Sequence, residues 1–229
     1  MHDSAKWNAV KYIAKLVMMC AIGAAAFFCA AGSVNVPRGI LYFTVYVTIS
    51  LLGGAYLFLA CPETLGSRSR IAPDTQKWDM PILALLVPLA YCGIYVAAAL
   101  PWRLGEPFPP VVLYWTGIAV TVVTSVVTVW SVRENRNFES SVRIQKDRGH
   151  AVCSTGPYAV VRHPGYACMI VWAMALPMMF GLYAGIVAAL VIALLVVRTV
   201  LEDAVLRREL SGYGEYSKRV RYRLLPFVW

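Results

Sequence analysis

Hydrophobic and polar residues are segregated along this chain into long uncharged runs separated by short charged segments. A helix needs roughly 20 apolar residues to cross about 30 Å of hydrocarbon, and every uncharged run reaches that length. The runs do not alternate between polar and apolar residues, which excludes membrane-spanning strands as the main element. We therefore predict an all-α integral membrane protein with apolar runs at Leu16–Pro37, Gly39–Pro62, Met80–Trp102, Pro107–Val132 and Pro164–Val197.

The last run is too long for a single crossing. Its 34 residues would extend about 51 Å as one helix, at a rise of about 1.5 Å per residue. Pro177, Gly181 and Gly185 place a helix breaker and two flexible residues near its middle. We expect the chain to turn back between Pro177 and Gly185 and to form a C-terminal helical hairpin. The protein would then have five or six transmembrane helices.

Lysine and arginine are distributed unevenly between the two sides of this predicted bundle. If both termini are cytoplasmic, 19 of the 21 basic residues lie on the cytoplasmic side, and only Arg38 and Arg103 lie opposite. The positive-inside rule favours that orientation, and the even number of crossings it requires supports the hairpin. We attribute the net charge of +9 to topology and predict no nucleic-acid partner. The expected location is the cell membrane, or the endoplasmic reticulum in a eukaryote.

Composition supports the membrane class, because only 14% of residues are charged, against about a quarter in soluble domains. The first 31 residues also have the pattern of a signal peptide, with a small-residue stretch near Ala30-Ala31-Gly32. Since the apolar run is longer than a typical signal core and further spans follow, we favour an uncleaved first helix. The six cysteines show no CxxC and no ligand spacing, so we expect neither a disulfide nor a metal.

Ionisable residues are missing from the apolar runs, which argues against proton pumps, ion-coupled transporters and voltage sensors. Chemistry is expected instead at the cytoplasmic boundary, in residues 133–163 and 198–229. These segments are too short for a cofactor domain, and the chain has no GxGxxG or GxxxxGK[ST] motif. A nucleotide-like cofactor would bind between these loops and the helix ends. We therefore divide the chain into a four-helix membrane region, residues 1–132, and a catalytic region, residues 133–229.

The segment before the last apolar run carries a helix start beside polar donors. Gly156-Pro157 indicates a turn, and Pro164 stands at the preferred first position of a helix. The free N–H groups and positive dipole end of that helix suit a carboxylate, and Arg162 and His163 add donors. An ordinary basic loop next to the membrane would show the same features, so both interpretations stay open here.

Motifs in this region resemble those of a known family. The loop reads Gly156-Pro157-Tyr158-x3-Arg162-His163-Pro164-Gly165-Tyr166, which is similar to the signature of the isoprenylcysteine carboxyl methyltransferase and phospholipid methyltransferase superfamily. The C-terminal segment continues the series with Arg198-x3-Glu202-Asp203, Glu209-Leu210-Ser-Gly-Tyr213-Gly-Glu215-Tyr216-x2-Arg219 and Leu225-Pro226. The ordered series across residues 133–229 makes the resemblance specific. The helices before it match in hydropathy only.

This resemblance implies a membrane methyltransferase with S-adenosylmethionine as cofactor in a cytoplasmic pocket. It implies Arg198 as the substrate-binding residue, and Arg198, Glu202 and His163 as the catalytic group. The family's usual second glutamate is the shorter Asp203 here, so only Glu202 receives a role. The cofactor-binding residues it implies are Gln145, His150, Ala151, Val152, Cys153, Tyr158, His163, Pro164, Gly165, Tyr166 and Glu202.

Arg198 and Glu202 share a helix face at i, i+4, which fits a joint role at the pocket. The alternative is an intrahelical ion pair in which Arg198 extends to the membrane interface, although arginine preceding glutamate is the weaker order. We expect Arg198 to hold an acceptor carboxylate bidentately, and His163 to act as a base only if the acceptor must lose a proton. The tail either covers the pocket or anchors at the interface through Tyr213, Tyr216, Tyr222, Leu224, Phe227 and Trp229.

The expected activity is methyl transfer to a lipophilic acceptor dissolved in the membrane, either a small molecule or a lipid. The resemblance favours a carboxylate such as an isoprenylcysteine-type group, and thus an O-methyltransferase. Membrane lipids surround the protein as further partners. One alternative is an NADPH-dependent membrane reductase of the sterol or steroid type, to which Tyr222-Arg223-x2-Pro226 is also similar. Another is a membrane scaffold without enzymatic activity.

Overall fold

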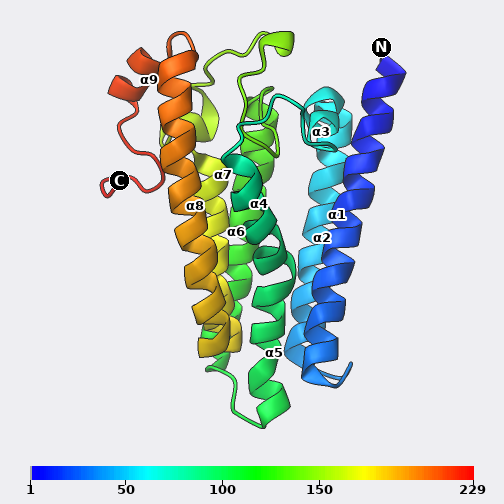
Figure 1. Cartoon of the computed structure of the whole chain (residues 1–229). Coiled ribbons are helices and arrows are strands. Elements are labelled where there is room, and N and C mark those ends of the chain that lie inside the picture. Colours follow the sequence, from blue (N-terminus) through cyan, green and yellow to red (C-terminus); the bar gives the residue numbers. More distant parts are fainter. Residues whose placement is uncertain (1) are drawn as a thin grey trace.

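A computed structural model describes residues 2–229, with side chains from Ser4 onward, and these residues form helices and loops without a strand (Figure 1). Five helical segments are long and apolar enough to cross a membrane: Ser4–Ala31, Pro37–Ala60, Asp79–Leu104, Val111–Glu134 and Leu182–Glu209. A sixth apolar helix, Pro164–Phe180, is shorter. The predicted all-α membrane fold is confirmed.

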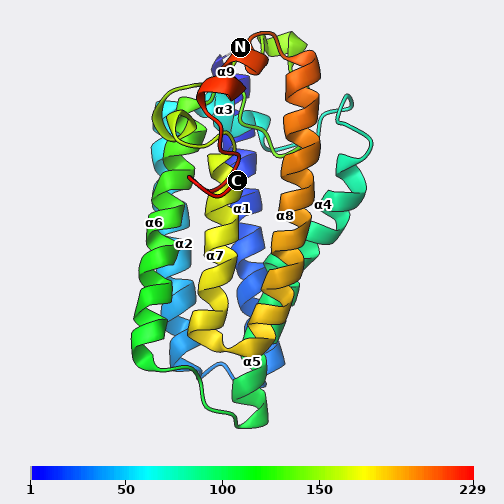
Figure 2. The same ribbon diagram turned by 90° about the vertical axis from the view of Figure 1, so that its left-hand side faces the viewer.

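The first half of the chain supplies three spans. Helices α1 (His2–Ala31) and α2 (Pro37–Ala60) lie side by side, and the short helix α3 (Pro62–Ser67) packs against the start of α1. The third span consists of α4 (Asp79–Pro88), a π-helical turn (Leu89–Gly93) and α5 (Ile94–Leu104). The π turn follows Pro88, which lacks the N–H that would continue the regular helix. Figure 2 shows α4 leaning away from the other helices above this turn, and within this third span α1 packs against α5 and the π turn.

The second half forms the predicted hairpin. Helix α6 (Val111–Glu134) packs along α7 (Pro164–Phe180), and α8 (Leu182–Glu209) returns beside α7. The turn between α7 and α8 is a single residue, Gly181, with φ 98° and ψ −171°. Only glycine adopts this backbone conformation without strain. The turn lies between Pro177 and Gly185 as expected but is narrower, because Pro177 continues α7 instead of ending it.

Aromatic side chains fill the core at the end of the bundle near this turn. Phe180 at the end of α7 contacts Phe27 and Tyr42 edge to face, with ring centroids 5.4 and 5.7 Å apart. The Tyr42 hydroxyl lies 3.1 Å from that of Tyr95 and accepts a hydrogen bond from the Trp172 indole. Edge-to-face rings add favourable energy beyond their buried area. The apolar end is therefore tightly packed, and space for a ligand is found at the opposite end.

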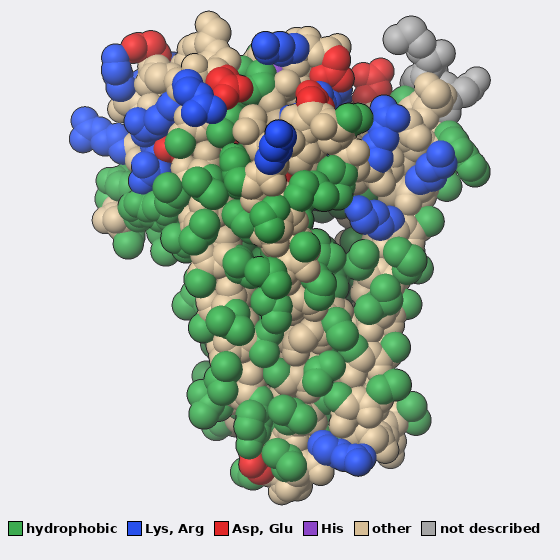
Figure 3. Space-filling model, viewed as in Figure 1, with side chains coloured by type: hydrophobic (Ala, Val, Ile, Leu, Met, Phe, Trp, Pro, Cys, Tyr) green, Lys and Arg blue, Asp and Glu red, His purple; other side chains and the backbone are tan. Residues whose placement is uncertain are grey.

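The opposite end carries most of the charge, as the space-filling view shows (Figure 3). It contains the loop of residues 135–163, with short 3-10 turns at Lys146–Arg148 and Gly156–Ala159, and helix α9 (Tyr213–Arg219). The N-terminus and α9 lie at this same end (Figure 1). The two catalytically promising segments of the sequence therefore meet on one side of the bundle.

Candidate active site

A cavity of about 600 Å³ lies at the charged end, between the loop of residues 135–163 and helices α1, α4, α7 and α8. This volume is within the usual range of pockets for small ligands. Every site residue expected from the sequence lines it: Gln145, His150, Ala151, Val152, Cys153, Tyr158, His163, Pro164, Gly165, Tyr166, Arg198 and Glu202. Their functional roles stay predictions, but the structure brings all of them to one space.

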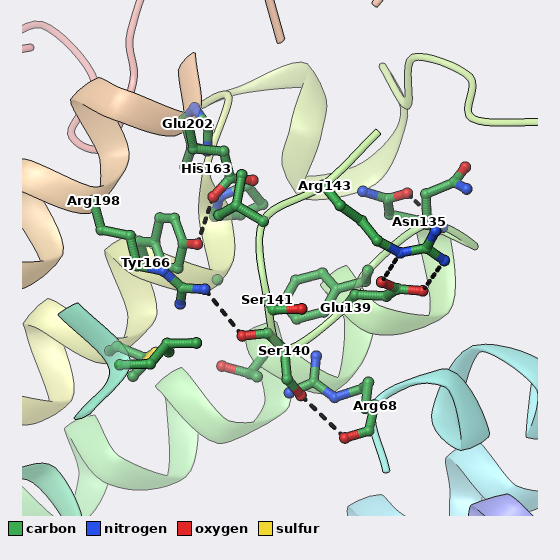
Figure 4. Close-up of a pocket in the computed structure, with 18 of the residues that line it drawn as sticks. Arg68, Asn135, Glu139, Ser140, Ser141, Arg143, His163, Tyr166, Arg198 and Glu202 are labelled. Atoms are coloured by element: carbon green, nitrogen blue, oxygen red, sulfur yellow. Dashed lines mark hydrogen bonds and ion pairs between the residues drawn. The ribbon is translucent and has the colours of Figure 1, made fainter. Parts of the chain in front are cut away.

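The start of α7 forms one wall of the cavity. Pro164 occupies the first helical turn, and a β-carbon added at Gly165 would lie 2.7 Å from the Phe138 ring, so only glycine allows this approach. At the next residue, the Tyr166 ring lies parallel to that of His163, and its hydroxyl donates a hydrogen bond to Glu202 on α8. Figure 4 shows this contact. Glu202 forms no ion pair with any described side chain, although its charge acts on the nearby Arg198.

Arg198 is held by an aspartate from a distant helix. Its Nε and Nη2 donate to the two carboxylate oxygens of Asp79 at 2.7 and 2.9 Å, and Nη2 also donates to the Ser140 carbonyl at 2.9 Å. The guanidinium lies 5.2 Å from the centre of the Tyr166 ring. The intrahelical pair with Glu202 is therefore not formed. The bidentate face of Arg198, which we expected to hold an acceptor, is occupied by Asp79. Among its guanidinium nitrogens, only Nη1 has no hydrogen-bond partner in the described part of the chain.

Asp203, for which we predicted no role, is the centre of a buried hydrogen-bond network. Its carboxylate accepts two hydrogen bonds from Arg162 at 2.8 and 3.1 Å and one from the Tyr213 hydroxyl at 2.8 Å. Arg207 and Arg223 each donate a further one at 3.1 Å. A buried carboxylate is stable only when donors satisfy it in this way. Asp203 thus joins α8, the loop and the tail, and the shorter side chain fits this structural position.

The tail is fixed to the Arg162-His163 dipeptide. The backbone N–H groups of Arg162 and His163 each donate to the tail at 2.9 Å, to the carbonyls of Tyr222 and Arg223. Nε2 of His163 lies 3.4 Å from both Asp203 Oδ1 and the Tyr213 hydroxyl. Of the tail residues singled out in the sequence, Tyr213 and Tyr216 line the cavity, and Leu224 is buried. Phe227 is 88% exposed, as an interfacial anchor would be, and both expected roles of the tail stay predictions.

The loop is rigidified by its own polar side chains. The Gln145 side chain is bonded through both of its polar atoms, donating to the Asn137 carbonyl at 2.6 Å and accepting from the Asn137 amide at 3.1 Å. Hydrogen bonds from Arg143 to Glu139 and Asp147 raise the pKa of Arg143 and fix the preceding turn. The polar side-chain atoms of Gln145 are therefore used in hydrogen bonds that stabilise the loop, although Gln145 also borders the cavity.

His150 lines the cavity with a ring whose tautomer is set by a hydrogen bond. The backbone N–H of Gln145 donates to its Nδ1 at 3.3 Å, so in the neutral ring the proton is on Nε2. Burial lowers the pKa of His150, which favours the neutral ring at physiological pH. No described group accepts a hydrogen bond from Nε2. His150 thus offers one N–H donor to a ligand.

Three residues of the site were not predicted from the sequence. Arg68 lines the cavity, and Asp79 and Asp203 pair with the lining residues Arg198 and Arg162. Asp79 stands just before an apolar run, 119 positions from Arg198, and no local spacing links the two. Within the described residues, no group of three His, Cys, Asp or Glu side chains is placed to hold a metal ion, and all six cysteines are unpaired.

The fold and the cavity define a helical membrane protein with a ligand pocket where the bundle meets the charged surface. Residues 115–208 match the model of the isoprenylcysteine carboxyl methyltransferase (ICMT) family. Two rice proteins, from Oryza sativa subsp. indica and subsp. japonica, are each described as a probable protein-S-isoprenylcysteine O-methyltransferase. Each is 27% identical over 129 residues, covering 53% of this chain and 67% of the rice protein. These matches confirm the resemblance to that superfamily.

Proposed function

We propose that this protein transfers a methyl group from S-adenosylmethionine to a lipophilic acceptor dissolved in the membrane, a carboxylate such as an isoprenylcysteine-type group. One observation carries the proposal. The cavity joins an unpaired carboxylate and loop donors at its polar end to apolar side chains of α1 and α4. A polar, cationic cofactor and an apolar acceptor can therefore meet inside one space.

The polar end offers groups that match S-adenosylmethionine. When bound, this cofactor supplies the methyl group as an electrophile attached to sulfonium sulfur. Glu202, which has no cationic partner among the described side chains, suits its positive charges. Nε2 of His150 donates a hydrogen bond, and the backbone N–H groups of Gly165 and Tyr166 at the start of α7 have no described acceptor. Those N–H groups and the dipole of α7 suit a carboxylate.

A carboxylate acceptor is already ionised at neutral pH, so the reaction needs no general base. The task of the protein is then to align the acceptor and exclude water, and alignment alone can contribute about 7–11 kcal/mol. This agrees with the position of His163, whose Nε2 faces Asp203 and Tyr213. Arg198 contributes its Nη1 as one donor to the acceptor, while Asp79 fixes the rest of the guanidinium.

The acceptor reaches this site from the membrane through a gap between α1 and α4. The cavity extends to Leu16 and Met19 on α1 and to Leu83 and Val87 on α4. Helix α4, which carries Leu83 and Val87, leans outward from the other helices (Figure 2). Figure 3 shows the surface hollowed just below the charged end. An apolar chain can lie there without leaving hydrocarbon surroundings.

Thermal-shift titrations of the purified protein in detergent test the cofactor, with S-adenosylmethionine compared against NADPH. Stabilisation by S-adenosylmethionine is expected. Stabilisation by NADPH alone would support the reductase alternative and contradict our proposal. Incubating membranes with methyl-labelled S-adenosylmethionine then tests the acceptor, because label should appear in a lipophilic fraction as a base-labile ester. Label found only in water-soluble products, or label that base does not release, would also contradict it.

Glu202→Gln should weaken S-adenosylmethionine binding. The substitution removes the charge but keeps an oxygen that can accept the Tyr166 hydrogen bond. Losing a charged hydrogen bond to a ligand typically weakens affinity by roughly tenfold to a hundredfold. The matched control is Glu215→Gln on α9, which removes an exposed carboxylate paired with Lys218 and should leave affinity unchanged. Isothermal titration measures both, and equal affinities in the two variants would remove Glu202 from the cofactor site.

A further inference from the structure

Most charged side chains that line the cavity form ion pairs, and the exceptions lie in two places. Five cations and two carboxylates face it. Three of the cations are neutralised: Arg143 by Glu139, Arg162 by Asp203 and Arg198 by Asp79. The unbalanced groups are Glu202 at the polar end, and Arg68 with Lys15 on the side of α1. Neither Arg68 nor Lys15 forms an ion pair with any described side chain.

Arg68 is fixed in place but not satisfied. Its guanidinium lies between two rings, 4.6 Å from the centre of the Phe138 ring and 5.1 Å from that of Tyr12. Its Nη1 is fully buried and, among the described residues, is the only buried side-chain nitrogen or oxygen without a hydrogen-bond partner. Leaving a buried charged donor unpaired costs free energy, and an anion from outside the chain would remove that cost.

Arg68 lies close to the proposed reaction site. The Ser140 hydroxyl donates to the Arg68 carbonyl at 3.2 Å, and the Ser140 carbonyl accepts from Arg198 at 2.9 Å. Figure 4 shows Ser140 between the two arginines, with the Arg68 guanidinium turned toward the same space. Ser140 therefore contacts both Arg68, which has no ion-pair partner, and Arg198, which is paired with Asp79.

The surroundings of Arg68 are apolar on the membrane side. Leu16 and Met19 follow Lys15 on α1, and Leu83 and Val87 face them from α4. A ligand with one anionic group and a long apolar chain matches this arrangement, in which a cationic region adjoins an apolar one. The anion would meet Arg68 and Lys15, and the chain would lie in the gap between α1 and α4.

We propose that Arg68, assisted by Lys15, is the anion-binding residue of the acceptor site and selects amphiphiles with a carboxylate or phosphate head group. This inference rests on the proposed function and adds to it, because it assigns acceptor recognition to the membrane region before residue 115, outside the matched family segment. Arg198 is already neutralised by Asp79, so Arg68 supplies the unsatisfied positive charge.

Binding of simple amphiphiles to the full-length protein in non-ionic detergent tests this site. The probes are dodecanoate, dodecyl phosphate and uncharged dodecanol, and intrinsic tryptophan fluorescence follows binding. The wild type should prefer both anions to dodecanol by about tenfold or more, and Arg68→Gln should lose this preference, since one charged hydrogen bond is typically worth that much. Arg68→Lys should retain most of it, which separates charge from stacking. Arg70→Gln, an exposed arginine in the same loop, is the matched control and should bind as the wild type.

The outcomes separate this inference from the proposed function. If dodecanoate binds Arg68→Gln as tightly as the wild type, the anion site is refuted, even where S-adenosylmethionine still binds. If S-adenosylmethionine binds neither the wild type nor any variant, but the preference for anions still depends on Arg68, the proposed function fails and the anion site stands. Inorganic phosphate at equal concentration should not displace dodecanoate; displacement would show that charge alone is recognised and would refute the amphiphile site.

Discussion

At the scale of single residues, Asp79 neutralises Arg198 and fixes the orientation of its guanidinium. It is fully buried at the first turn of α4, and its carboxylate also accepts a hydrogen bond from the Val142 backbone at 2.8 Å. It therefore connects α4, α8 and the loop of residues 135–163 through one charged group. Removing one partner of a buried pair leaves the other charge uncompensated. Asp79 is accordingly a positioning residue for Arg198.

Asp79→Asn should destabilise the protein by about 3–5 kcal/mol, the usual effect of breaking a buried ion pair. The matched control is Asp74→Asn, because Asp74 also pairs with an arginine but its side chain is 57% exposed. Exposed pairs contribute about 1 kcal/mol or less. Unfolding by a denaturing detergent measures both free energies. Similar losses in the two variants would show that the Asp79 pair is not buried in the membrane-embedded protein.

The pH dependence of stability should report on His150. Because burial lowers the pKa of His150 below the 6.5 of an unperturbed histidine, the folded state binds fewer protons than the unfolded chain just below that pH. The free energy of unfolding should therefore fall as the pH drops through 6.5. His150→Gln should show a smaller fall over the same interval. Superimposable pH profiles of the wild type and this variant would contradict the lowered pKa.

The sequence predicted the residues at the cavity better than their partners. The motif from Gly156 to Tyr166 and the i, i+4 spacing of Arg198 and Glu202 are local patterns, and the structure places all of these residues around one space. The partners of Arg198 and Arg162 could not be found in this way. Asp79 lies 119 positions from Arg198, and such a pairing depends on how helices pack, which no local pattern encodes.

At the scale of elements, the turn between α7 and α8 determines whether Arg198 reaches the pocket. Both helices are apolar, and their close antiparallel packing brings the start of α7 beside Glu202 near the end of α8. Length and two glycines predicted this hairpin. The π turn after Pro88 was not predicted, because a proline within an apolar run can equally well cause a kink or end a helix. That turn tilts α4 and opens the side of the cavity.

Gly181→Ala should destabilise the hairpin by about 1–3 kcal/mol, because a β-carbon is strained at the backbone angles of this residue. The matched control is Gly185→Ala in α8. There the added carbon would meet Pro177 at 3.4 Å, an ordinary contact, and alanine favours the helix by roughly 0.5–1 kcal/mol. Denaturant titration should therefore give changes of opposite sign. Equal effects would mean that the turn adopts another conformation.

At the scale of the whole molecule, both parts of the chain build the pocket. Residues 133–229 supply the groups proposed to hold the cofactor, and residues before 133 supply Asp79, Arg68 and the apolar surfaces of α1 and α4. Hydropathy and the distribution of basic residues were sufficient to predict the bundle. They could not predict how the first helices contribute to the site, because membrane-helix packing depends on surface shape and leaves no periodic signal in a uniformly apolar run.

The orientation of the bundle provides the last prediction, because the pocket requires the loop and the tail on the same side of the membrane. The excess of basic residues at that end predicts that it faces the cytoplasm. In a variant without native cysteines, single cysteines can replace Lys146 in the loop, Lys218 in α9 and Glu106 between α5 and α6, all exposed positions. In intact cells that carry the protein in the plasma membrane, an impermeant maleimide should label only the position 106 cysteine, and opening the cells should expose the other two. Labelling of position 146 and position 218 from opposite sides would separate the loop from the tail, and no shared pocket could then exist.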